Sequence, residues 1–146
     1  MIDVAGLSKR AVAGAQIPGA NSASAPVVVV AEDEAMIREL VVLALVDAGF
    51  EVVETQDGGE ALTALEARAS DVSVLFSDIH MPGSLDGLAL ANYARHRWPN
   101  LGIVLASGRA TPDPTKLPEG CHFFPKPYAL DDVVRHLLNV VGGSRG

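Results

Sequence analysis

The chain has 146 residues, an apolar content of 49% and a formal net charge of −7 at pH 7. This length suffices for one domain with its own core, and the negative charge argues against direct binding to nucleic acid, which usually needs a basic surface. No apolar run approaches the roughly 18 residues of a membrane helix, and no apolar stretch that would mark a secretory signal follows Lys9 and Arg10. We therefore expect a cytoplasmic protein without a membrane partner.

The chain divides into three parts by composition. Residues 1–26 are rich in Ala, Gly, Ser and Pro and lack aromatic residues, which predicts a flexible tail or the end of a linker. Residues 27–142 carry the regular apolar patterns of one folded domain, and residues 143–146 are expected to be a frayed terminus. Cys121 is the only cysteine, so an internal disulfide bond is excluded.

Short apolar runs alternate with helical patterns along the predicted domain. Such runs are typical of buried parallel strands. The first helix should bury one face made of Ile37, Leu40, Val41, Ala44 and Leu45. Strands are predicted at about 27–32, 52–55, 72–77, 101–106 and 121–125, and helices at about 35–48, 58–68, 86–97 and 129–141. Right-handed crossovers between five such strands predict an α/β fold with a doubly wound parallel sheet.

The connection between the fourth and fifth strands differs from the others. It contains Pro112, Pro114 and Pro118, and a proline both disfavours helical geometry at the preceding residue and lacks a backbone donor. We therefore expect a short, distorted or mobile fourth helix. Partner binding would then rely more on the fifth strand and the last helix, including Phe123 and Tyr128.

Polar side chains follow four of the predicted strands at the point where each strand ends. They are Glu32 with Asp33, Asp78, Ser107 and Lys126. In an open α/β sheet functional groups gather outside the carboxyl ends of the strands, so these residues should converge on one crevice. Three carboxylates, a hydroxyl and an amine together indicate a site for a divalent cation and a phosphoryl group.

Each of these residues also has an ordinary structural explanation. Asp33 could cap the following helix, Asp78 and Ser107 could belong to turns, and Lys126 could be a solvated lysine before Pro127. All of these explanations would have to hold at once, at the ends of four strands of one sheet, which favours a common site instead.

In this order and spacing the residues resemble a known family. Glu32-Asp33, Asp78 with Met81-Pro82 and Asp86-Gly87, Ser107, and Lys126-Pro127 look like the receiver domain of two-component response regulators. The resemblance covers roughly residues 27–141. It implies a flavodoxin-like sheet with strand order 2-1-3-4-5, although the segment from Ser107 to Lys126 is a few residues short for the family.

The resemblance also implies roles for individual residues. Asp78 would accept a phosphoryl group from a histidine kinase phosphohistidine, and Ser107 and Lys126 would contact that group. Mg²⁺ would be held by Asp33 directly, by Glu32 mainly through water, and by Asp78 and the backbone carbonyl of His80. Ser107 and Phe123 would form the switch, Phe123 alternatively being an ordinary packed aromatic, and His80 and Arg109 would govern phosphoryl lifetime.

The expected function is therefore that of a stand-alone phosphoacceptor rather than an enzyme. Its partners would be a histidine kinase or phosphotransfer protein and an unidentified downstream protein. A receiver portion of a hybrid histidine kinase is the main alternative. A Mg²⁺-dependent aspartyl-phosphate phosphohydrolase is disfavoured, because its haloacid-dehalogenase-like form needs Asp-x-Asp where this chain has Glu32-Asp33-Glu34. A phosphate-independent interaction module is disfavoured because the whole polar set is present.

Overall fold

The computed structural model describes residues 25–109 and 112–143. Five parallel strands form one sheet in the order β2-β1-β3-β4-β5. The strands are β1 (Val27–Ala31), β2 (Glu51–Thr55), β3 (Val72–Asp78), β4 (Gly102–Ser107) and β5 (His122–Pro125). The helices are α2 (Ala35–Asp47), α3 (Gly58–Arg68), α4 (Gly87–Arg97), the 3₁₀ turn η1 (Pro114–Lys116) and α5 (Leu130–Gly143). The predicted fold class and strand order are confirmed, and the expected tail and final residues lie almost wholly outside the described ranges.

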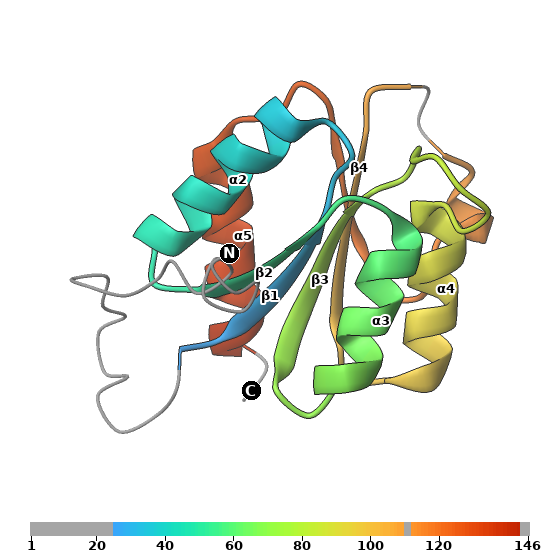
Figure 1. Ribbon diagram of the computed structural model, residues 1–146, viewed down its shortest axis with the longest axis horizontal. Coiled ribbons are helices and arrows are strands. Elements are labelled where there is room, and N and C mark those ends of the chain that lie inside the picture. The colour runs from blue at the N-terminus through green and yellow to red at the C-terminus, as the bar shows by residue number, and fades with distance from the viewer. Residues whose placement is uncertain (1–24, 110–111, 144–146) are drawn as a thin grey trace.

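The helices cover both faces of the sheet, with α2 and α5 on one side and α3 and α4 on the other (Figure 1). The strict alternation of a strand explains the two core halves. Along β1, Val27 and Val29 point into the core under α3 and α4, whereas Val28 and Val30 point into the core under α2 and α5. All five β1 residues are buried, because both neighbours and both faces of this central strand are occupied.

Helix α2 departs from the sequence expectation in its buried face. Leu40 was predicted to be buried but is 52% exposed, and the residues that pack on the sheet are Val41, Val42 and Leu45. Gly49 follows the helix with φ of 103°, a left-handed conformation that glycine adopts without strain. The chain then enters β2.

The connection from β4 to β5 contains, in its described part, only the three-residue turn η1 as helix. The expectation of a short fourth helix is confirmed. Two side chains of α4 hold the segment in place: Asn92 Nδ2 donates to the carbonyl of Lys116 at 3.0 Å, and Arg95 Nε donates to the carbonyl of Glu119 at 2.9 Å. These bonds satisfy backbone acceptors that a helix would otherwise have paired internally.

The register of the strands brings the polar residues to one edge. Ala31 lies opposite Ser77, Asp78 opposite Ala106, and Ser107 opposite Pro125. Residues that follow these positions therefore share one end of the sheet. Among the described residues, no helix is long and apolar enough to cross a membrane.

Candidate functional site

The turn after β1 directs its two acidic side chains differently. Glu32 is 4% exposed, whereas Asp33 is exposed. The Glu32 backbone N–H donates to the carbonyl of Thr55 at 3.2 Å, and its Oε2 accepts from the Glu34 N–H at 3.1 Å. The N-cap of α2 is Glu34, without a side-chain cap. Asp33 is therefore not the cap residue of this helix.

The carboxylate of Asp78 ends β3, directly beside that turn. It is 8% exposed. Glu32, Asp33 and Asp78 each present a carboxylate oxygen within 4.8 Å of the other two. Such close carboxylates repel one another unless a cation lies between or beside them.

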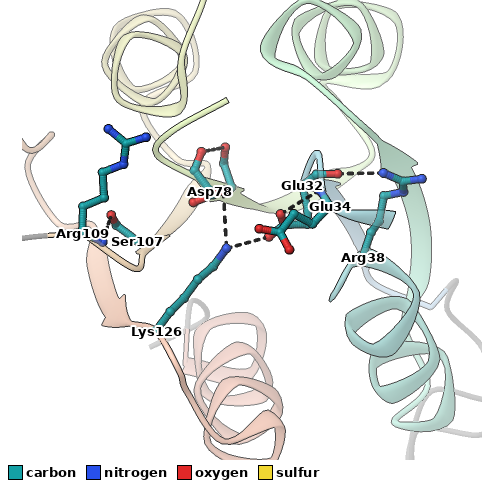
Figure 2. A network of polar contacts seen from close by, with 8 residues as sticks. Glu32, Glu34, Arg38, Asp78, Ser107, Arg109 and Lys126 are labelled. Atoms are coloured by element: carbon teal, nitrogen blue, oxygen red, sulfur yellow. Dashed lines mark hydrogen bonds and ion pairs between the residues drawn. The ribbon is translucent and has the colours of Figure 1, made fainter. Parts of the chain in front are cut away.

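Lys126 supplies a cation to this group (Figure 2). Its Nζ lies 3.1 Å from Glu32 Oε1 and 3.4 Å from Asp78 Oδ2. The lysine is placed by the end of β5, where its backbone N–H donates to the carbonyl of Ser107 at 2.8 Å. The Lys126–Pro127 peptide bond that follows is cis.

Burial and charge act in opposite directions on these groups. Burial raises the pKa of Glu32 and of Asp78, and Lys126 offsets part of each rise. The charge of Asp33 adds to the rise at Asp78. Burial alone would lower the pKa of Lys126, but its hydrogen bond to Glu32 and the charges of both carboxylates raise it above its ordinary value. The lysine is therefore charged at neutral pH and partly neutralises the acidic group.

A cavity of about 270 Å³ opens over Asp78 and Lys126. Glu32 does not line it, because its carboxylate lies deeper and faces Lys126 and Glu34. The lining residues are Asp33, Glu34, Asp78, His80, Gly108, Arg109 and Lys126. A larger hollow of about 460 Å³ lies at the opposite strand ends, beside Trp98, and no carboxylate lines it.

The remaining predicted residues lie around this cavity or below it. Ser107 is buried, and its Oγ accepts from the backbone N–H of Arg109 at 3.0 Å. His80 and Arg109 are exposed at the rim. Phe123 is half-buried in β5, packs against the core on the α3 and α4 side, and does not line the cavity.

Sequence reasoning missed Arg38, the fourth residue of α2. Its Nη1 donates to the backbone carbonyl of Glu32 at 2.9 Å, and its Nε lies 3.5 Å from Glu54 Oε2. The available signal was an arginine three residues after Ala35, the first residue of the helix. That spacing alone does not reveal a bond that runs back to the preceding turn.

Comparisons with known proteins agree with this geometry. A family model described as "Response regulator receiver domain" matches residues 28–137. The chain is 34% identical over 111 residues to the DNA-binding transcriptional regulator NtrC of Salmonella typhimurium, covering 74% of this chain but 23% of that protein. It is 32% identical over 114 residues to the response regulator receiver protein CpdR of Brucella abortus, covering 75% of this chain and 92% of that protein.

A solved structure has the same fold. The response regulator receiver protein from Sinorhizobium medicae superposes with a TM-score of 0.77 at 26% identity, covering 82% of this chain and 97% of that one.

Proposed function

The chain belongs to the response regulator receiver family of two-component signalling, and from this premise we propose that Asp78 accepts a phosphoryl group from a histidine kinase phosphohistidine in the presence of Mg²⁺. One observation carries the proposal. Asp78 is the buried carboxylate that both faces the cavity and lies beside Lys126 at 3.4 Å, within the group formed with Glu32 and Asp33.

The transfer makes simple chemical demands on the site. An oxygen of the Asp78 carboxylate forms a bond to phosphorus, the bond from phosphorus to the donor's imidazole nitrogen breaks, and the electron pair remains on that nitrogen. Negative charge on the phosphoryl oxygens must be balanced throughout. Lys126 lies where it can balance part of that charge. Ser107 Oγ accepts from the Arg109 N–H, which leaves the hydroxyl proton of Ser107 available for donation to the phosphoryl group.

The donor set fits a hard divalent cation, which prefers carboxylate and carbonyl oxygens. Asp33 and Asp78 line the cavity and would hold the ion directly, with the backbone carbonyl of His80 as a third protein ligand. Glu32 would act through water, which is supported by its two oxygens already accepting hydrogen bonds from Lys126 and Glu34. When bound, Mg²⁺ would neutralise charge on the phosphoryl oxygens.

Phosphorylation would also alter the surface. Movement of Ser107 toward the phosphoryl group would shift the end of β4. Phe123, which is half-buried in the adjacent strand β5, would then change its side-chain conformation. His80 and Arg109 flank the cavity mouth and would set the access of hydrolytic water, and with it phosphoryl lifetime. A donor protein can pack beside the cavity on α2, where Met36, Leu40 and Leu43 are exposed.

Two arrangements of the natural protein are compatible with this activity. A stand-alone receiver is one candidate, by similarity to CpdR, since the match covers 92% of that protein. A receiver within a hybrid kinase is the second candidate, because the chain is 36% identical over 112 residues to the sensor kinase CckA of Brucella abortus. The match covers 12% of that kinase.

Intact-mass measurement after incubation with acetyl phosphate and Mg²⁺ tests the proposal. The parent protein should gain the mass of one phosphoryl group, and Asp78→Asn should abolish this gain. Asp57→Asn is the matched control, since Asp57 follows β2 at the same edge but caps α3 by accepting from the Glu60 N–H at 2.8 Å. An undiminished gain in Asp78→Asn would assign the phosphoryl group to another residue.

A further inference from the structure

Arg38 ties three elements together immediately behind the acidic site. Its guanidinium donates from Nη1 to the backbone carbonyl of Glu32 at 2.9 Å and pairs through Nε with Glu54 of β2 at 3.5 Å. Its side chain is 19% exposed. A half-buried arginine with two acceptors on different elements is well ordered, because its planar group fixes both contacts at once.

We propose that Arg38 is a positioning residue for the metal site, which holds the peptide unit between Glu32 and Asp33 so that the Asp33 carboxylate faces the cavity. The inference rests on the proposed function and adds to it a residue that does not touch the ion. It acts through the backbone of the turn rather than through a ligand atom.

The covalent geometry of the turn supports this role. The carbonyl of Glu32 and the N–H of Asp33 belong to one rigid planar peptide unit, so a bond to that carbonyl restricts the backbone angles of Asp33. β1 ends at Ala31 and α2 begins at Ala35, which leaves a turn of few residues with little other backbone pairing. The bond from Arg38 to the Glu32 carbonyl therefore holds the orientation of the peptide unit that leads into Asp33.

The neighbouring groups of Glu32 are anchored by other partners. Its N–H is paired with the Thr55 carbonyl, and its carboxylate with Lys126 and Glu34. The N–H and the carboxylate of Glu32 thus have other partners, and Arg38 bonds to its backbone carbonyl. Loss of the arginine would leave Glu32 in position and free the peptide unit that orients Asp33.

A Mg²⁺ titration of the folded protein by calorimetry tests the inference. Arg38→Ala should weaken Mg²⁺ binding by about tenfold, the scale at which partners of metal ligands usually contribute. Arg38→Lys keeps the charge but cannot donate to both acceptors in the same planar geometry, so it should also weaken binding, to a smaller degree. Because removal of a nearby positive charge should by itself strengthen cation binding, weaker binding in Arg38→Ala cannot come from the lost charge. Equal affinity in the parent and in Arg38→Lys would show that the planar contact with both acceptors is not needed and would overturn the positioning role.

Arg68→Ala is the matched control. Arg68 of α3 pairs with Glu51 of the same strand β2 at 3.0 Å and has a comparable exposure of 29%, but it lies at the other end of that strand. Both alanine variants should lower the unfolding temperature without metal, and only Arg38→Ala should lower Mg²⁺ affinity. If Arg38→Ala and Arg68→Ala bound Mg²⁺ with equal affinity, the inference would be overturned, whereas the proposed metal site would stand. A parent protein that does not bind Mg²⁺ would overturn the proposed function and the inference with it.

Discussion

Replacement of Lys126 by methionine removes one positive charge from the acidic site and keeps most of the side chain's apolar length. Each ion pair, at 3.1 Å to Glu32 and 3.4 Å to Asp78, corresponds to about 5 kcal/mol of attraction at an effective dielectric constant of about 20. Desolvation of the charges offsets most of this attraction, and breaking a fully buried pair costs about 3–5 kcal/mol. Because the Lys126 side chain keeps 17% exposure, we expect a loss in the free energy of unfolding of about 2–3 kcal/mol.

The pH dependence of this loss identifies its cause. Lys126 lowers the pKa of both carboxylates, so its removal raises those pKa values further above the ordinary 4.5 of Glu32 and 3.8 of Asp78. A carboxylate with a raised folded-state pKa contributes stability below its unfolded-state pKa and loses it as pH rises through the folded-state pKa. The deficit of Lys126→Met should therefore be largest near neutral pH and should fall below about 1 kcal/mol near pH 4.

Urea denaturation without metal, at about pH 7.5 and about pH 4, measures the deficit directly. Lys116→Met is the control, because Lys116 is exposed on η1. It should change stability by less than about 0.5 kcal/mol at both pH values. A deficit of the same size at both pH values would refute the electrostatic reasoning and point to lost packing over Gly108, which lies against the Lys126 side chain.

Two further predictions concern other parts of the fold. A Cβ atom at Gly87 would clash with the backbone oxygen of Asp78, so Gly87→Ala should destabilise the protein by about 2 kcal/mol in urea denaturation. Gly59→Ala is the control, because a Cβ atom there meets only an atom at 3.4 Å and should not destabilise the protein. Equal denaturation midpoints for the two variants would contradict this prediction. Burial and the adjacent His122 lower the pKa of His136 below 6.5, so its contribution to stability is present above that pH and is lost as pH falls through the lowered pKa. His136→Gln should flatten the fall in unfolding free energy between about pH 7 and pH 5, and parallel profiles would count against it.

The strands were predictable because a buried parallel strand leaves a nearly continuous apolar run. All five predicted strands lie within two residues of the observed bounds. The buried face of α2 was not predictable in the same way. Apolar residues surround much of this helix, so periodicity did not distinguish Leu40, which is exposed, from Val42, which is buried. The buried face of α2 is determined by its packing against the sheet, and the local apolar pattern does not specify that packing.

The convergence of the site residues was predictable from strand ends, but their orientations were not. Glu32 and Asp33 have the same chemistry and adjacent positions, yet one carboxylate faces Lys126 and the other is exposed. Their difference arises from contacts with Thr55, Glu34 and the distant Lys126, which no local pattern encodes. The bond from Arg38 to the Glu32 carbonyl was missed for the same reason.

In the proposed function, the balance of charge in the cavity would link the metal to the phosphoryl group. Three carboxylates meet a single ammonium group, so the site without metal has an excess of negative charge. A phosphoryl donor brings further negative charge and is repelled by that excess, whereas a divalent cation removes it. Once phosphorylated, Asp78 would carry more negative charge than its carboxylate did, and Lys126 and Ser107 are the nearby groups that can turn toward it. The same imbalance that makes the site costly to fold would thus make the proposed phosphoryl transfer depend on the cation.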